Sequence, residues 1–180
     1  MKKINEIFYS LQGEGYFTGT AAVFVRFSGC NIKCSFCDTD HEGGEMLSDE
    51  QIIAEIKKYP AKHIVLTGGE PSLFIDRSFI DKLHQSGLFV QIETNGTNEL
   101  PDNIDWITCS PKHASVVLEK SNEVKVVYTG QDMRNYDQFN AEYYYLQPCS
   151  GKNTEDVVNF IMKNPQWKLS LQIHILLNIR

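Results

Sequence analysis

The sequence predicts an α/β fold with a mostly parallel sheet, formed by one domain over residues 1–180. Short apolar or alternating runs, rich in β-branched and aromatic residues, take turns with longer segments of helical spacing, which is the pattern of repeated βα units. The 180 residues are 42% hydrophobic, and a chain of this length buries enough surface for a core without disulfide staples. Because no repeat, low-complexity tract or linker-like stretch divides the chain, we expect a single domain.

Seven segments fit strands and three fit helices. The strand candidates are residues 21–28, 63–67, 89–94, 104–109, 123–128, 142–147 and 168–175. The helix candidates are residues 48–59, 76–86 and 154–164. The first helix begins at Ser48 with Gln51 three residues on, which is a capping box, and Pro60 ends it. The carboxyl ends of parallel strands meet at one edge of a sheet, so the reactive site is expected there.

The charge and the hydropathy pattern exclude several classes of protein. With 17 basic and 23 acidic residues the net charge is −6, which argues against non-specific binding to nucleic acid or to an anionic membrane. No stretch approaches the roughly 18 to 20 consecutive apolar residues of a membrane span. Residues 1–6 lack the apolar block of a signal peptide. We therefore expect a cytoplasmic protein with no nucleic-acid and no membrane partner.

Three of the five cysteines lie close together after the strand candidate 21–28. Cys30, Cys34 and Cys37 have the spacing CxxxCxxC, and a loop this tight can wrap three thiolates around one metal centre. A four-iron cluster normally takes four thiolates, so three would leave one iron open to a cofactor. Zinc with His41 as a fourth ligand is an alternative, although structural zinc usually takes paired CxxC units.

Polar or glycine-bearing turns follow four further strand candidates. They are Thr67-Gly68-Gly69-Glu70-Pro71, Ile92-Glu93-Thr94-Asn95-Gly96, Cys109-Ser110-Pro111-Lys112 and Leu146-Gln147-Pro148. The paired glycines allow the backbone to approach a ligand closely, and Glu70 can accept hydrogen bonds from an ammonium group. Four such turns fit one site at the edge of a sheet.

The cysteine loop, with Phe36 directly before its last cysteine, resembles the signature of the radical S-adenosylmethionine superfamily. The resemblance implies a [4Fe–4S] cluster on the three cysteines, S-adenosylmethionine on the open iron, and a 5′-deoxyadenosyl radical that begins the reaction by hydrogen abstraction. The sequence GGEP at 68–71 matches the motif that holds the methionine amino group. Only one helix and one strand fit between Cys37 and this motif, so we expect an abbreviated partial (β/α) barrel.

Three motifs resemble those of one family within this superfamily, the 7-carboxy-7-deazaguanine synthases: SLQGEG at 10–15, FVRFSGC at 24–30 and CDT at 37–39. The resemblance implies conversion of 6-carboxy-5,6,7,8-tetrahydropterin to 7-carboxy-7-deazaguanine with loss of ammonia, in the biosynthesis of queuosine. It also implies Mg²⁺, a small pterin substrate, an electron donor such as flavodoxin or ferredoxin, and a homodimer.

The same resemblance assigns expected roles to individual residues. Thr39 would give its hydroxyl to Mg²⁺, an ion that takes few protein ligands, and the guanidinium of Arg26 has the fork geometry that pairs with a carboxylate. The expected substrate-binding residues are Leu11, Gln12, Gly13, Glu14, Arg26, Glu93 and Thr94. The expected cofactor-binding residues are Gly68, Gly69, Glu70, Gly96, Ser110, Pro111, Lys112 and Gln147.

The remaining cysteines and histidines carry no pattern of their own. Cys109 and Cys149 are expected to be buried small hydrophobes. His63, His84 and His113 are expected to be structural or surface residues. No role is assigned to His174.

Two other kinds of protein share part of the pattern. A glycyl-radical-activating enzyme would have a similar short chain and cysteine loop, but it would not need the combination of Arg26 and Thr39. An iron–sulfur electron carrier or a zinc-binding module would explain the cysteines alone and leave GGEP and the glycine-rich N-terminal segment unexplained.

Overall fold

The computed structural model describes residues 1–37, 39–112, 116–136 and 139–180, and within these ranges nine strands form one sheet. The sheet order is β3-β1-β2-β4-β5-β6-β7-β8-β9. The strands are β1 (Lys2–Leu11), β2 (Ala21–Phe27), β3 (Glu45–Leu47), β4 (His63–Gly68), β5 (Phe89–Thr94), β6 (Trp106–Cys109), β7 (Ser121–Tyr128), β8 (Ala141–Pro148) and β9 (Trp167–Leu169). All pairs from β2 to β9 are parallel, and β1 is antiparallel to both β2 and β3.

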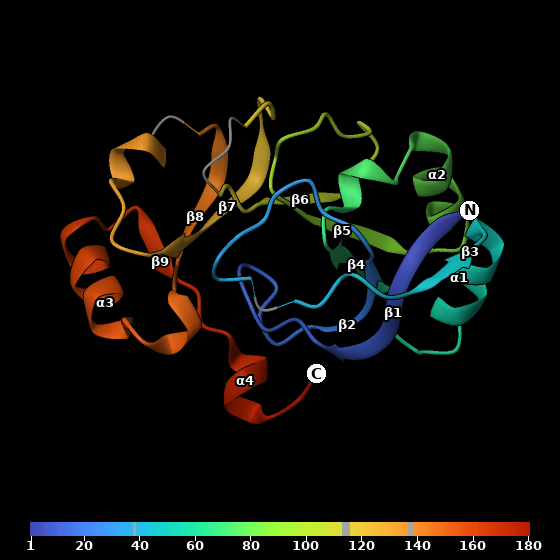
Figure 1. The fold of residues 1–180 in the computed structure, drawn as a ribbon, viewed down its shortest axis with the longest axis horizontal. Helices are drawn as coiled ribbons and strands as arrows, with labels where there is room; N and C mark the ends of the chain where they lie inside the picture. The colour runs from blue at the N-terminus through green and yellow to red at the C-terminus, as the bar shows by residue number, and fades with distance from the viewer. Residues whose placement is uncertain (38, 113–115, 137–138) are drawn as a thin grey trace.

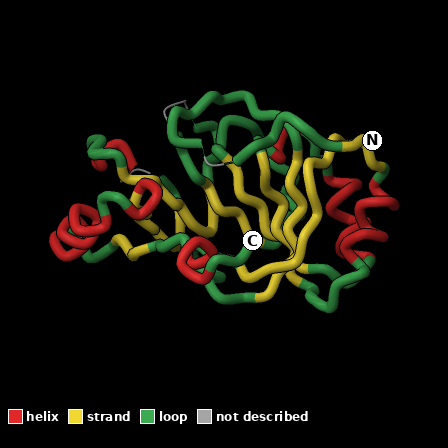
Figure 2. Tube along the Cα trace, turned by 60° about the horizontal axis from the view of Figure 1, so that its bottom comes forward, coloured by secondary structure: helices red, strands yellow, loops and turns green. Residues whose placement is uncertain are grey.

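In the described ranges, three helices cover the outer side of this sheet: α1 (Asp49–Ile56), α2 (Arg77–Gln85) and α3 (Thr154–Lys163). A short helix, α4 (Ile173–Leu177), lies apart from them near the C-terminus (Figure 1). The 3₁₀ turns are η1 (Pro71–Leu73), η2 (Met133–Tyr136) and η3 (Cys149–Gly151). In Figure 1 the strands form an open arc, with α1 and α2 outside one end and α3 outside the other. Figure 2 shows the strands running side by side between these helices. The predicted α/β partial barrel with mostly parallel strands is confirmed.

Local sequence explains where the two helices on one end of the arc begin. The predicted capping box starts α1, since Ser48 Oγ accepts from Gln51 N at 3.2 Å and Gln51 Oε1 accepts from Ser48 N at 2.8 Å. Asp76 caps α2 by accepting from Phe79 N at 2.8 Å. Each such cap stabilises its helix by about 1 kcal/mol. None of the helices in the described ranges is long and apolar enough to span a membrane.

Two apolar clusters lie between the helices and the outer face of the sheet. One packs Ile52 of α1 and Phe79 of α2 against strands β2, β4 and β5, and the other packs Val157 of α3 against strands β7 and β8. Because side chains alternate across a strand, the other face of these strands turns polar residues inward. These inward residues are Arg26 on β2, Thr67 on β4, Glu93 on β5, Lys125 on β7 and Gln147 on β8.

The structure differs from the predicted elements at both ends of the chain. Residues 168–175 are not one strand: β9 ends at Leu169, and α4 begins at Ile173, whose N–H donates to the Gly13 carbonyl at 3.1 Å. The alternating apolar residues of this segment do not face the core, since Ile175 is 57% exposed. Strands β1 and β3 are absent from the prediction, and they form the antiparallel part of the sheet.

Candidate active site

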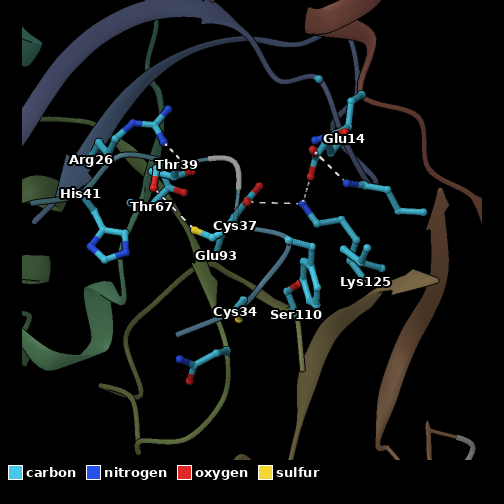
Figure 3. A pocket seen from close by; sticks show the side chains of 18 of the residues that line it. Glu14, Arg26, Cys34, Cys37, Thr39, His41, Thr67, Glu93, Ser110 and Lys125 are labelled. Atoms are coloured by element: carbon cyan, nitrogen blue, oxygen red, sulfur yellow. Dashed lines mark hydrogen bonds and ion pairs between the residues drawn. The ribbon is translucent and has the colours of Figure 1, made fainter. Parts of the chain in front are cut away.

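A cavity of about 430 Å³ opens at the carboxyl ends of the parallel strands and gathers nearly all of the predicted site residues (Figure 3). Those on its wall are Leu11, Gln12, Gly13, Glu14, Arg26, Cys30, Cys34, Cys37, Thr39, Gly68, Gly69, Glu70, Glu93, Thr94, Ser110, Lys112 and Gln147. Gly96 and Pro111 lie outside this wall. Asp38 of the CDT motif lies outside the described residues.

The cysteine loop and the GGEP turn are held in register by close backbone contacts. Gly29 O, directly before the loop, accepts from Glu70 N at 2.9 Å. A side chain at Gly69 would collide with the Gly29 carbonyl, so only glycine allows this approach. The fold therefore fixes the three cysteines and the GGEP turn on one wall of the cavity.

The donor set of the cysteine loop fits an iron–sulfur cluster. Cys30, Cys34 and Cys37 all face the cavity, and thiolates are the ligands of such clusters. Burial raises the pKa of the Cys34 thiol, Lys112 opposes this, and the neighbouring Cys37 and Cys30 raise it further. The three cysteine side chains are thus close enough to interact electrostatically. In the described ranges, however, no three His, Cys, Asp or Glu side chains are arranged as ligands of one metal ion. The loop has no helix or strand that would prevent such an arrangement.

The Glu70 carboxylate is buried and fixed by three donors. Its Oε1 accepts from Thr94 Oγ1 at 2.6 Å and from Ser72 N at 3.1 Å, and its Oε2 accepts from Asn95 N at 2.7 Å. Glu70 is 1% exposed and lies on the cavity wall. A carboxylate held in this way is a preset acceptor for an ammonium group.

One side of the cavity carries two carboxylates joined by a buried ammonium. Lys125 Nζ lies 3.3 Å from Glu93 Oε2 and forms a second ion pair with Glu14 (Figure 3). Gln12 Nε2 donates to Glu93 Oε1 at 3.0 Å, and Gln147 Nε2 donates to Glu14 Oε1 at 3.1 Å. We call these five residues the acidic end of the cavity.

Charge pairing outweighs burial at the acidic end. Burial opposes the ionisation of Glu14, but the charge of Lys125 and its hydrogen bond hold the pKa of Glu14 below its usual value. Burial likewise disfavours the ammonium of Lys125, yet the surrounding carboxylates of Glu14, Glu93 and Glu123 raise its pKa. Both partners are therefore charged at neutral pH.

The other side of the cavity carries a guanidinium. Arg26 Nη1 donates to Thr39 Oγ1 at 3.1 Å, and Arg26 Nε donates to Glu6 Oε1 at 2.9 Å. The guanidinium lies over the Phe8 ring, 5.6 Å from its centroid. Figure 3 shows Arg26 and Thr39 on one side of the pocket and Glu14 and Lys125 on the other, so the cavity is electrically polarised.

Several cavity residues were missed by the sequence reasoning. Lys125, Asn95 and His174 all line the wall, and the His174 ring packs so closely on Gly13 that a side chain there would collide with it. Lys125 had one usable signal: it lies in the middle of an apolar strand candidate, flanked by Val124 and Val126.

The spare cysteines and histidines have mixed outcomes. Cys109 is buried as predicted, whereas the prediction for Cys149 is wrong, because η3 places it half-buried on the cavity wall. His63 bonds to Gln91 and His84 pairs with Asp105, both as structural residues. The remaining prediction, for His113, lies outside the described residues.

Comparisons with known proteins agree with this geometry. The Radical SAM superfamily profile matches residues 24–163. A 7-carboxy-7-deazaguanine synthase of Bacteroides thetaiotaomicron is 60% identical, with 100% of both chains covered, and one of Burkholderia multivorans is 40% identical, with 98% of each chain covered. The crystal structure of QueE from Escherichia coli has a TM-score of 0.78 and 31% identity, covering 95% of this chain and 93% of that chain.

These matches run over almost the whole chain, so they confirm the resemblance that the motifs predicted. They support neither the electron carrier nor the zinc-binding module, because the relatives are enzymes by name. The chain belongs to the radical S-adenosylmethionine superfamily and, within it, to the 7-carboxy-7-deazaguanine synthase family.

Proposed function

We propose that this chain converts 6-carboxy-5,6,7,8-tetrahydropterin to 7-carboxy-7-deazaguanine with loss of ammonia, in the biosynthesis of queuosine and other 7-deazapurines. Family membership supports the reaction. The observation that carries the proposal is the polarised cavity, which has the three cysteines and the GGEP turn on one wall and lies between a guanidinium and two carboxylates.

The cofactor side of the site follows from the superfamily, which implies a [4Fe–4S] cluster and S-adenosylmethionine. Cys30, Cys34 and Cys37 would hold three irons, and Glu70 would accept hydrogen bonds from the methionine amino group. When bound, the two groups supply the radical that takes a hydrogen atom from the substrate. The other residues proposed to contact this cofactor are Gly68, Gly69, Gly96, Ser110, Pro111, Lys112 and Gln147. Gly96 and Pro111 do not line the cavity, so they would contribute by holding the neighbouring cavity residues in place.

The substrate side follows from the polarity of the cavity. The substrate has one carboxylate and one aminopyrimidine edge rich in N–H donors. Arg26 would pair with the carboxylate, and Thr39 beside it would give its hydroxyl to Mg²⁺, which fixes the carboxylate and stabilises charge during ring contraction. Gln12, Glu14 and Glu93 would accept from and donate to the aminopyrimidine edge. Leu11, Gly13 and Thr94 are proposed to complete the wall around the pterin.

Further parts of the proposal concern the whole molecule. Superfamily membership implies a reductant, for which flavodoxin or ferredoxin is proposed, and a homodimer is proposed from the family resemblance. Residues 1–180 are proposed to act as one domain, since all nine described strands share one sheet. A cluster held by thiolates requires reduced cysteines, so the cytoplasm is the proposed compartment.

The test is anaerobic reconstitution of the cluster, followed by incubation with dithionite, S-adenosylmethionine and the carboxytetrahydropterin. A brown protein that absorbs at ~400 nm is expected, and mass spectrometry should detect the deazaguanine acid. Removal of Mg²⁺ by chelation should slow turnover, a dependence that a glycyl-radical-activating enzyme would not show. No product from a protein with an intact cluster would contradict the proposal.

A further inference from the structure

We propose that Lys125 is a positioning residue: it holds Glu14 and Glu93 as a preset pair of ionised acceptors that recognises the N–H donor edge of the substrate. This inference rests on the proposed function and deepens it. Lys125 itself need not contact the substrate, because its ammonium is engaged by the two carboxylates.

Burial of the Lys125 ammonium is energetically unfavourable unless the charge is paired and hydrogen-bonded. Lys125 is 3% exposed and lies on β7, an interior strand of the sheet. Removing an ammonium from water costs several kcal/mol, and an ion pair offsets this only when its geometry is good and its remaining groups are hydrogen-bonded. Such a pair adds little stability compared with apolar packing, so a role in the cavity is the stronger reason for a lysine here.

The hydrogen bonds around Glu14 and Glu93 fix the orientation of both carboxylates. Gln147 Oε1 accepts from Ser170 Oγ at 3.0 Å, and Gln12 Oε1 accepts from Glu14 N at 3.2 Å. Each glutamine carbonyl is thereby occupied, so each amide group turns its N–H₂ toward a carboxylate. The second oxygen of each carboxylate is held by Lys125. The two carboxylates are thus fixed before any ligand arrives.

The charge of the acidic end selects the orientation of the substrate. The charges of Glu14, Glu93 and Lys125 sum to −1, and Glu123 is a third carboxylate near the same ammonium. Without Lys125 the half-buried carboxylates of Glu14 and Glu93 would repel one another, which favours protonation of one of them. The Glu93 oxygens have one hydrogen-bond donor each, from Gln12 and Lys125, and each can accept a second. Glu14 is held more fully, because Gln172 is also hydrogen-bonded to it. A neutral edge with adjacent N–H donors fits this surface, while the substrate carboxylate is repelled toward Arg26 on the opposite side.

The experiment is a cycle that combines one variant with one substrate analogue. The variant is K125M, which keeps the length of the side chain and removes the charge, and the analogue is the carboxytetrahydropterin with hydrogen in place of the 2-amino group. For the wild-type enzyme we expect loss of the amino group to raise KM about 30-fold. For K125M we expect a KM already raised about 30-fold, with less than about a threefold further rise on the analogue.

Controls separate this role from general damage. K168M removes an exposed lysine of β9 and should leave both KM values unchanged. The iron content and the absorption at ~400 nm of reconstituted K125M should match those of wild type, since none of the three cysteines that would hold the cluster belongs to the acidic end. If K125M does not fold, K125Q replaces it, because an amide keeps one hydrogen bond and still removes the charge.

The outcomes are distinct. A wild-type enzyme that makes no product contradicts the proposed function itself. A wild-type enzyme that does make product, together with a folded variant that discriminates against the analogue as strongly as wild type does, overturns the role of Lys125 alone. Loss of discrimination in the variant supports it.

Discussion

Glu70→Gln changes one atom of a buried carboxylate that accepts hydrogen bonds from three donors. In the wild type, Oε1 accepts from Thr94 Oγ1 and Ser72 N, and Oε2 accepts from Asn95 N. An amide nitrogen cannot accept, so one oxygen position becomes a donor whichever way the amide turns. If it replaces Oε2, it faces the Asn95 N–H, and if it replaces Oε1, it faces the Ser72 N–H.

The magnitude follows from these contacts. At least one hydrogen bond to a charged group is lost and a buried backbone N–H is left without its acceptor, so we expect a loss of about 2 to 3 kcal/mol in the free energy of unfolding. The ammonium group of S-adenosylmethionine also loses a charged acceptor. Its Kd should rise about 10- to 100-fold, which corresponds to about 1.4 to 2.8 kcal/mol.

Urea unfolding of the apoprotein gives the first quantity, and equilibrium binding of S-adenosylmethionine to the reconstituted protein gives the second. Glu55→Gln is the matched control, because Glu55 is 45% exposed and its ion pair, with Lys58, lies on the surface. That variant should change the free energy of unfolding by less than about 0.5 kcal/mol. An E70Q protein as stable as wild type would refute the idea that the three donors depend on the carboxylate.

Three further outcomes follow from single residues. Gly96 has a φ of +79°, and a Cβ there would lie 2.8 Å from Cys109 Sγ, so G96A should cost about 2 to 4 kcal/mol of unfolding free energy. G87A, at a φ of +72° in open space, should cost only about 1 kcal/mol, and equal losses in urea unfolding would contradict the role of the contact. Burial raises the pKa of Cys109 to about 12, so alkylation of the folded apoprotein at about pH 8 should leave Cys109 unmodified in mass spectra; early labelling would show that it is accessible. Burial opposes ionisation of Asp49, but Lys2 and Lys82 hold its pKa below the usual value. Because the pKa of Asp49 is lower in the folded state than in the unfolded chain, its ionisation stabilises the fold above the unfolded-state pKa, and this stabilisation is lost as the pH falls. The difference in unfolding free energy between wild type and D49N should therefore shrink below about pH 4. A difference that stays constant with pH would be evidence against these ion pairs.

The parallel part of the sheet could be predicted because its strands obey simple rules. Residues 89–94 were predicted as a strand and are β5, since an apolar run bounded by Gly87 and Gly96 has few other solutions. Helices α1, α2 and α3 were predicted within a few residues, whereas α4 was not predicted. Ser48 and Asp76 give local start signals for α1 and α2. Strand boundaries and helix caps are set by residues that are adjacent in the sequence, so one sequence is enough to predict them.

The antiparallel edge could not be predicted for a physical reason. A bulge in β1 between Ile4 and Glu6 shifts its pairing with β2, which interrupts the two-residue alternation that reveals a strand. Residues 168–175 show the opposite error. Their alternation of Leu169, Leu171, Ile173 and Ile175 is regular. However, β9 is the edge strand of the described sheet, its pairing with β8 ends at Leu169, and the chain then turns into α4.

The site shows a similar division between motif and context. The cysteine spacing and GGEP predict one wall of the cavity, whereas Lys125 carries no motif. In a parallel sheet covered on both faces, strands are nearly continuous apolar runs, so Glu93, Lys125 and Gln147 in such strands indicate that their inner face is not a core. Their partners in space, Gln12 and Glu14, come from the N-terminal segment, 81 residues before Glu93 and 111 residues before Lys125 respectively, and only the fold brings them together. A buried lysine between two valines is therefore a signal for a polar cavity, and its specificity comes from the carboxylates that the fold brings to it.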